Sequence, residues 1–202
     1  MHASHYLALM ALPLVAYAAG SIPWGLWIAR LACGADIRRL GSGNIGATNV
    51  RRIAGTVPGI LTLAADGLKG AVPVWIAAVL VPEVSAYTAF VGLSVFLGHL
   101  YPVFSRFRGG GKGVATAGGV VLALSPAALL TALLSFVWVV CLSSRVSVAS
   151  LAASTCLPLF LWEATGSMSH TVMASVMALL IWWRHRQNLR RLIEGTEPVI
   201  DW

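Results

Sequence analysis

The sequence predicts an all-α, polytopic membrane protein that forms one integral membrane domain over residues 1–202. Three observations lead to this fold class. Hydrophobic residues fill 58% of the positions and charged residues only 10%, a balance typical of membrane proteins and not of soluble cores. Apolar stretches long enough to cross a hydrocarbon layer of about 30 Å recur along the chain. The Lys and Arg residues are confined to a few of the segments between those stretches.

Seven transmembrane helices are expected, because each apolar stretch of about 20 residues can cross the bilayer once. They cover residues 6–31, 57–81, 87–103, 114–124, 126–142, 146–162 and 170–183. The first has no Lys or Arg before it and continues past Ala16-Tyr17-Ala18, which resembles a signal-peptidase site. We therefore expect an uncleaved helix and not a signal peptide. The apolar stretch after the glycines is too long for one crossing, and Ser125-Pro126 divides it into two helices.

The distribution of positive charge predicts how these helices are oriented. If the N-terminus is outside, the cytoplasmic segments are 30–52, 104–112, 143–145 and 184–202. These segments contain thirteen of the fourteen Lys and Arg residues, and the outside segments contain none. Because Lys and Arg are retained on the cytoplasmic side, the N-terminus is expected outside and the C-terminus inside. The same rule accounts for the net charge of +7, so no nucleic-acid partner is expected.

The segment 107–116 carries the strongest sequence signal for a binding site. Three consecutive glycines precede Lys112, and a fourth, Gly113, follows it. Glycine lets backbone N–H groups converge without a Cβ in the way, and a turn that leads into a helix start is an anion site. A flexible loop between membrane helices is the alternative, which the close grouping of Arg106, Arg108 and Lys112 disfavours. A Walker loop is excluded because Gly113 stands where Ser or Thr is required.

A second polar segment precedes the helix at 57–81. Residues 41–46 match the G-x-G-x-x-G pattern, but no β-strand precedes them, so a dinucleotide site is rejected. The side chains of this segment are instead expected to form a hydrogen-bonding pocket, in which arginine grips phosphate through two parallel bonds. The residues concerned are Ser42, Gly43, Asn44, Thr48, Asn49 and Arg52. Arg38 and Arg39 are expected to serve only the membrane topology.

Further polar residues lie in or beside the apolar segments. His99 ends a helix just before the glycines, where a structural hydrogen bond is the commoner role. Asp66 and Lys69 are one helical turn apart inside an apolar segment, and they either pair with each other or belong to a site. Two more pairs at helical spacing are candidates for the pocket, namely Ser147 with Ser150 and His185 with Asn188. The alternatives are a helix cap for the serines and a juxtamembrane helix on anionic lipid for the tail.

Signatures of several other enzyme classes are missing from the sequence. No H-x₄-D motif, no G-x-S-x-G elbow and no H-E-x-x-H metal pair occur. Cys33, Cys141 and Cys156 lack the spacing of metal ligands, and the interior acids are too few for a carboxylate metal site. No metal and no other cofactor is therefore expected.

Three patches of sequence occur together and in order over nearly the whole chain. They are Gly41-Ser-Gly-Asn-Ile-Gly-Ala-Thr-Asn49 with Arg52; Gly98-His99, Pro102-x-Phe104 and Gly-Gly-Lys112-Gly-Val-Ala-Thr116; and His185-x-x-Asn188-x-x-Arg191 with Gly195-x-Glu197. In this combination the chain resembles the PlsY family, the bacterial acyl-phosphate:glycerol-3-phosphate acyltransferases. The family usually has two glycines before the lysine, whereas this chain has three, Gly109 to Gly111.

The resemblance implies transfer of a fatty acyl group from acyl phosphate to the 1-hydroxyl of sn-glycerol-3-phosphate, which gives lysophosphatidic acid and phosphate. It also implies a multi-pass protein of the bacterial inner membrane, surrounded by membrane lipid, with its active site at the cytoplasmic face and a role in phospholipid biosynthesis. The donor is already activated, so no covalent nucleophile is needed, and substrate phosphate is implied as the base. Alignment of two substrates can supply about 7–11 kcal/mol of the barrier reduction.

On this interpretation the residues of the chain divide into two groups. The expected catalytic residues are Lys112, Arg52, Asn188 and His185. The expected substrate-binding residues are Ser42, Gly43, Asn44, Thr48, Asn49, His99, Gly110, Gly111, Gly113, Ser147 and Ser150. Lys112 and its turn are assigned to the donor phosphate, and Arg52 with the tail residues to glycerol-3-phosphate.

Two alternatives can be compared with this hypothesis. A small secondary carrier or channel for an organic phosphate would place polar groups near the membrane midplane, often within inverted repeats, whereas here they fall at one face and no repeat is visible. Among other donors, acyl-CoA requires room for an adenine. Acyl carrier protein is acidic and requires a broad basic face, which the segment 184–191 supplies. A glycine-lysine turn around one small phosphate fits acyl phosphate best.

Overall fold

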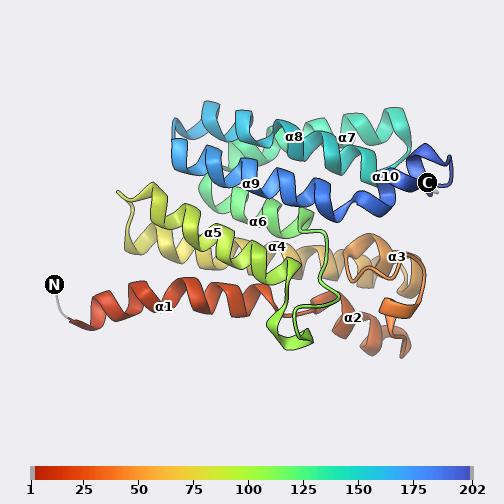
Figure 1. The fold of residues 1–202 in the computed structure, drawn as a ribbon, viewed down its shortest axis with the longest axis horizontal. Helices are drawn as coiled ribbons and strands as arrows, with labels where there is room; N and C mark the ends of the chain where they lie inside the picture. Colours follow the sequence, from red (N-terminus) through yellow and green to blue (C-terminus); the bar gives the residue numbers. More distant parts are fainter. Residues whose placement is uncertain (1–2, 201–202) are drawn as a thin grey trace.

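A computed structural model gives the arrangement of residues 3–200, and all its regular elements in that range are helices. The helices are α1 (Ala3–Gly20), α2 (Trp24–Cys33), α3 (Ala47–Ala54), α4 (Thr56–Leu80), α5 (Ser85–Leu100), α6 (Val114–Leu124), α7 (Pro126–Ser143), α8 (Val146–Thr165), α9 (Met168–Arg184) and α10 (Arg186–Ile193), with short 3-10 helices η1 (Ile37–Arg39) and η2 (Val103–Ser105). Figure 1 shows the long helices side by side in one bundle, with the turns gathered at its two ends.

The helices occupy the apolar segments that the sequence predicts, with ends that differ by at most three residues. The first segment is broken into α1 and α2 because Pro23 has no N–H to continue the helix. Ser125 caps α7 by accepting a hydrogen bond from Ala128 N at 3.2 Å, which explains the division from α6. Five segments in the described range are long and apolar enough to cross a membrane, and α6 is a shorter apolar helix.

The helix α3 corrects one expectation, because its residues were predicted to lie in a loop. Val50 is fully buried and Ile53 packs beside it, so one face of this short helix joins a small apolar cluster with Leu26 and Ile45. With eight residues, α3 is too short to show a helical repeat in the sequence. Its packing against α2 and α4 supplies the stability that its composition lacks.

Small residues allow the central helices to approach closely. A Cβ added to Gly70 of α4 would overlap the carbonyl oxygen of Thr116, and one added to Gly119 of α6 would overlap that of Gly67. Without a hydrophobic driving force in lipid, close backbone packing of this kind holds membrane helices together. The main core surrounds α5, where Val91, Val95 and Phe96 are fully buried.

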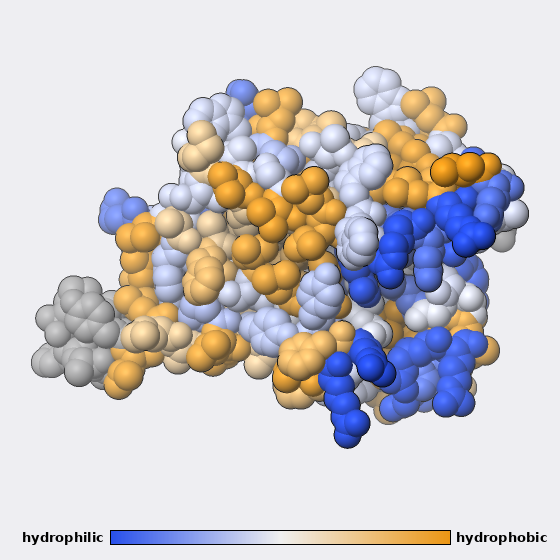
Figure 2. Space-filling model, viewed as in Figure 1, coloured by the Kyte–Doolittle hydropathy of each residue, from blue (hydrophilic) through white to orange (hydrophobic). Residues whose placement is uncertain are grey.

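The two ends of the bundle differ in polarity. The α4–α5, α6–α7 and α8–α9 turns lie at one end, and α2, α3, α10 and the segment 101–113 lie at the other (Figure 1). In the same view, Figure 2 shows strongly hydrophilic residues over that second end and mostly hydrophobic residues along the body. The three sequence patches therefore meet at one polar end of an apolar bundle.

Candidate active site

The turn that carries Lys112 crosses the end of α5 and leads into α6. Gly111 N donates to His99 O at 3.2 Å, so this N–H is not free for a ligand. A Cβ added to Gly110 would overlap Leu100 O, and one added to Gly111 would overlap the ring of His99. These two positions therefore require glycine because the turn lies directly on α5.

The N–H groups that follow are in a different situation. Those of Lys112, Gly113 and Val114 have no acceptor within residues 3–200. They precede the first hydrogen-bonded turn of α6, where Ala117 N donates to Gly113 O at 2.8 Å. Free N–H groups at the start of a helix attract anions. Within residues 110–114, Gly111 N is therefore the one backbone donor that the described chain already occupies, and the others are open to an anion.

Arg184 holds the turn from the side of α9. Its Nε donates to Gly111 O at 3.0 Å, and its Nη2 donates to Gly110 O. The guanidinium also lies 6.0 Å from the ring centroid of Tyr101. From the sequence alone, Arg184 is only one of the expected cytoplasmic charges. Its contacts with Gly111 and Gly110 join positions that are 73 and 74 residues apart, which residue type and spacing do not reveal. The turn is therefore clamped between α5 and α9.

Several charges converge on Lys112, whose side chain is partly buried. The pKa of the Lys112 ammonium is lowered from 10.5 to about 8, and burial is the largest cause of the shift. The Glu197 carboxylate opposes this effect, whereas the positive charges of Arg191, Arg52 and Arg184 add to it. Lys112 therefore stays mostly protonated at pH 7 and, with the three guanidinium groups, creates a strongly positive site for an anion.

Glu197 links the tail to this site, although the sequence analysis gave it no role beyond the family motif. Asn188 Nδ2 donates to its Oε1 at 2.6 Å and Arg191 Nε donates to its Oε2 at 2.7 Å. Burial of the carboxylate opposes ionisation, but nearby Ser147, Asn188 and Arg191 outweigh it, and the pKa of Glu197 is lowered. The Ser147 hydroxyl is buried and is not aligned with any acceptor or donor in the described chain. Glu197 is therefore ionised, and it holds the side chains of Asn188 and Arg191 in position.

His185 is buried where α9 passes into α10. Its Nδ1 lies 2.8 Å from Ile181 O, and a carbonyl oxygen can only accept, so Nδ1 carries the proton. Burial, together with the positive charge of Lys112, lowers the pKa of His185 from 6.5 to about 4. The imidazole is therefore neutral near pH 7, and its Nε2 is an acceptor that no donor in residues 3–200 occupies.

The polar segment before α4 is organised by Asn49. Its Nδ2 donates to three carbonyl oxygens, those of Ile37, Leu40 and Asn44, and its Oδ1 accepts from Ser42 N at 3.0 Å. With both ends of the amide engaged and only 2% of the residue exposed, Asn49 shapes the loop and is not free to bind a ligand.

The other predicted residues of this segment are more accessible. Ser42, Gly43, Thr48 and Arg52 are exposed. Asn44 Oδ1 accepts from Gly46 N at 2.9 Å, which leads the chain into α3. Arg52 stands on α3 near enough to lower the pKa of Lys112. Within the described range no hydrogen bond joins this segment to the Lys112 turn, so their connection is electrostatic.

Buried charged residues of α4 lie next to His99, which contacts the glycine turn. Lys69 Nζ lies 2.8 Å from Asp66 Oδ1 and also donates to Ile22 O at 2.9 Å. The same Asp66 oxygen is 3.7 Å from His99 Nδ1, and His99 in turn accepts the Gly111 N–H through its carbonyl. Asp66 and Lys69 therefore form an ion pair, and His99 connects this pair to the glycine turn.

The remaining candidates sit at the start of α8. Ser150 Oγ donates to Val146 O at 2.8 Å, whereas Ser147 Oγ makes no hydrogen bond in residues 3–200. Within the same range no group of three or more His, Cys, Asp or Glu side chains is arranged to hold a metal ion. The structure thus gathers Lys112, Arg52, His185, Asn188 and Ser147 around one place at the polar end.

Comparison with known proteins identifies the family. A protein-family model described as glycerol-3-phosphate acyltransferase matches residues 10–195. The chain belongs to this family. A glycerol-3-phosphate acyltransferase of Geobacter sulfurreducens is 48% identical over 188 residues, which are 93% of this chain and 95% of the relative. One of Geotalea daltonii is 49% identical over 187 residues, or 91% and 93% of the two chains.

Solved structures give the same result. The crystal structure described as PlsY (YgiH), an integral membrane glycerol 3-phosphate acyltransferase in its glycerol 3-phosphate form, superposes with a TM-score of 0.91 at 43% identity. The lysophosphatidic acid form of PlsY superposes with a TM-score of 0.89 at 42% identity. Each comparison covers 96% of both chains. The resemblance to the PlsY family in the three sequence patches is confirmed, and so is an integral membrane fold.

Proposed function

We propose that this protein transfers a fatty acyl group from acyl phosphate to the 1-hydroxyl of sn-glycerol-3-phosphate, giving lysophosphatidic acid and phosphate. The turn at Lys112 carries the proposal, because its three free N–H groups and one ammonium fit a small phosphate. The acceptor and product are supported by the PlsY relatives described as glycerol 3-phosphate and lysophosphatidic acid forms.

The donor phosphate would bind at the N–H groups of Lys112, Gly113 and Val114. Lys112 would neutralise the charge that grows on the leaving phosphate as the bond between the acyl carbon and the phosphate oxygen breaks. Because Arg184 and α5 fix the turn on both sides, these donors need little reorganisation during the reaction. Preorganised donors of this kind stabilise developing charge most effectively.

The acceptor would lie between α3 and the tail. Arg52 is exposed at the edge of the site and would bind the phosphate of glycerol-3-phosphate through its two-pronged guanidinium. The Nε2 of neutral His185, unoccupied within residues 3–200, would accept a hydrogen bond from the 2-hydroxyl of glycerol-3-phosphate. This contact would orient the 1-hydroxyl oxygen toward the acyl carbon and leave the 1-hydroxyl proton for another acceptor. Glu197 would keep Asn188 and Arg191 in place beside it.

The proton of the attacking hydroxyl requires an acceptor during the reaction. Glu197 is engaged by Asn188 and Arg191, and the pKa of His185, about 4, makes this residue a weak base. A phosphate oxygen of the substrate is therefore the proposed proton acceptor. The step then balances: the new ester bond forms, the acyl–phosphate bond breaks, and the proton leaves with phosphate.

The direct test is an assay of the purified protein with two donors. Given glycerol-3-phosphate and palmitoyl phosphate, it should form lysophosphatidic acid with one phosphate released per product. Palmitoyl-CoA under the same conditions should give none, and the Lys112→Ala variant serves as the matched negative control. Strong activity with the thioester contradicts the donor assignment. Uptake of glycerol-3-phosphate into sealed vesicles without acylation would favour the carrier alternative.

We also propose that seven helical segments cross a bacterial inner membrane with the active site on the cytoplasmic side. The gathering of thirteen Lys and Arg residues in the predicted inside segments supports this orientation. In a variant whose three cysteines are replaced by serine, cysteine at Val84 should react with an impermeant maleimide from outside intact cells. Cysteine at Phe107 should react only after lysis. Both side chains are exposed, and the reverse pattern would contradict the proposed orientation.

A further inference from the structure

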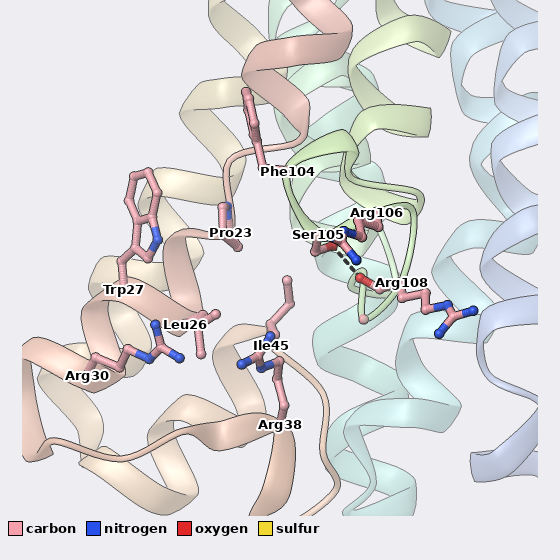
Figure 3. A pocket seen from close by; sticks show the side chains of 11 residues that line it. Pro23, Leu26, Trp27, Arg30, Arg38, Ile45, Phe104, Ser105, Arg106 and Arg108 are labelled. Atoms are coloured by element: carbon pink, nitrogen blue, oxygen red, sulfur yellow. Dashed lines mark hydrogen bonds between the residues drawn. The ribbon is translucent and has the colours of Figure 1, made fainter.

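A cavity opens at the polar end, beside the residues that precede the glycine turn (Figure 3). Its volume is about 430 Å³. It is lined by α2, the segment before α3 and the residues just before the glycines, namely Pro23, Leu26, Trp27, Arg30, Arg38, Ile45, Phe104, Ser105, Arg106, Arg108 and Gly109. Lys112, His185 and Glu197 are not part of this lining, so the cavity, here called the arginine pocket, is separate from the candidate active site.

Positive charge dominates the arginine pocket. Four arginines line it, and the acid that contacts them is Asp36, which lies 3.2 Å from Arg30 and accepts from Arg38 Nε at 2.9 Å. The hydrogen bond from Arg38 holds the pKa of the Asp36 carboxyl well below its usual range, so Asp36 cancels one charge of the four. The guanidinium groups of Arg106 and Arg108 have no hydrogen-bond or ion-pair partner within residues 3–200. The pocket has unused capacity for an anion.

Aromatic and apolar side chains stand beside these charges. Trp27 is 46% exposed and Phe104 is 65% exposed, and Figure 3 shows both at one side of the pocket, with Leu26 and Ile45 nearer its centre. The first membrane-spanning segment ends at Cys33, so Trp27 and Arg30 lie in its last turns. Trp and Arg at the end of a spanning segment mark the headgroup layer of the bilayer.

We propose that the arginine pocket binds the phosphate headgroup of an anionic glycerophospholipid from the surrounding bilayer. Arginine guanidinium groups bind phosphate oxygens in pairs, and the apolar side chains would contact the glycerol backbone and the first carbons of the acyl chains. A soluble phosphate compound would gain nothing from the exposed aromatic wall. Basic residues at the cytoplasmic membrane surface attract anionic lipids in the same way.

The position of the pocket would allow a bound lipid to affect the candidate active site through a shared segment of chain. Residues 104–106, 108 and 109 line the pocket and residues 110–113 form the turn around Lys112, so the two sites share one continuous segment. Ser105 Oγ donates to Arg108 O, which ties the pocket half of this segment into a compact loop. A bound headgroup would therefore restrain the segment that places the Lys112 N–H groups.

The test compares pocket arginines with a neighbouring arginine that lies outside the pocket. Binding of phosphatidylglycerol and of phosphatidylcholine to delipidated protein in detergent would be measured by native mass spectrometry. The pocket variant is Arg30→Gln with Arg106→Gln, which leaves the Arg38–Asp36 bonds intact. The control is Arg39→Gln, because Arg39 is exposed and next to Arg38 but does not line the pocket.

Wild-type protein should retain phosphatidylglycerol in preference to phosphatidylcholine. The pocket variant should lose about 25-fold in phosphatidylglycerol affinity, because each arginine near an anionic lipid contributes about a factor of five, and the control should change less than about 2-fold. Equal retention of the two lipids, or equal losses in both variants, would overturn the proposal. Displacement of the lipid by millimolar inorganic phosphate would make this a soluble phosphate site.

Arg106→Gln alone covers the case in which the double variant does not fold, because this change breaks no interaction within residues 3–200. It should lower phosphatidylglycerol affinity by about a factor of five.

Discussion

The Lys112 site and the arginine pocket lie on consecutive parts of one segment, yet they are built differently. Most groups around Lys112 are buried or partly buried, and several are bonded to one another, as the Asn188–Glu197–Arg191 contacts and the Arg184 clamp show. Arg52, which is exposed, is the exception. The arginine pocket is open, and two of its guanidinium groups have no partner in residues 3–200. Fixed donors suit a phosphate that must react, whereas exposed arginines suit one that is only held.

The largest expected effect comes from removing the charges nearest the reacting groups. Lys112→Ala and Arg52→Ala should each lower turnover by about 10²-fold or more, as loss of a preorganised donor does. The measurement is initial velocity with palmitoyl phosphate at saturating glycerol-3-phosphate. Arg39→Gln, which removes a charge from the same end of the bundle, is the matched control and should stay within about 3-fold. Similar losses in all three variants would mean that turnover depends no more on the Lys112 site than on other positive charges at the same end of the bundle.

A smaller effect is expected from loosening the clamp on the turn. Arg184→Gln removes the charged donors to Gly110 O and Gly111 O, and kcat/KM for the acyl donor should fall by about 10-fold. Arg184→Lys retains a charged donor for one carbonyl and should recover part of the loss. A fall in kcat/KM for glycerol-3-phosphate alone would contradict the assignment of the turn to the donor phosphate.

The pKa of Lys112, lowered to about 8, predicts a pH dependence. Phosphate binding needs the ammonium form, so kcat/KM for the acyl donor should fall as pH rises through about 8. The stability of the folded protein should change in the opposite direction. The pKa of Lys112 in the folded state lies below the unfolded value of 10.5, so the unfolded state binds more protons between about pH 8 and pH 10.5. The free energy of unfolding should therefore increase as pH rises through this range.

The matched control for this pH profile is Lys112→Arg. Arginine keeps its proton in this range, so the fall near pH 8 should disappear, even if the variant is slower overall. If the fall persists unchanged in Lys112→Arg, another group is responsible for it.

The smallest expected effect distinguishes Ser42, which is expected to contact substrate, from Asn49, which holds its own loop in shape. Ser42→Ala keeps the backbone N–H that donates to Asn49 Oδ1 and should raise KM for glycerol-3-phosphate by about 3-fold to 10-fold if the hydroxyl touches substrate. Asn49→Ala should instead lower the thermal stability of the protein, because three carbonyl oxygens, one of them in a fully buried bond, lose their donor. A KM effect without a stability effect for Asn49→Ala would reverse these roles.

The sequence predicted the helices well because the signal for a membrane span is local. A run of apolar residues satisfies its backbone in lipid by forming a helix, and Ser125-Pro126 marked the end of the short helix α6. The helix α3 was missed because eight residues with mixed polarity carry no clear repeat, and its stability comes from contact with α2 and α4.

The site was predicted in part, and the limits have a physical cause. Residue type and charge pointed to Lys112, Arg52 and His185, and the structure brings them near one another. The roles of Arg184 and Glu197 depend on contacts between distant segments, which neither residue type nor spacing reveals. The amide of Asn49 is of a type suited to ligand binding, but only the fold shows that both of its ends are engaged inside its own loop.

The most direct measurement is a structure of the protein with glycerol-3-phosphate and an unreactive acyl phosphonate bound together. The phosphonate should lie within hydrogen-bonding distance of Lys112 Nζ and the N–H groups of Gly113 and Val114, with the acceptor phosphate on Arg52. Its acyl carbon should face the acceptor hydroxyl beside His185 Nε2. A phosphonate seated among Arg30, Arg38 and Arg106 in the arginine pocket, with the Lys112 turn empty, would contradict the assignment of catalysis to the Lys112 site.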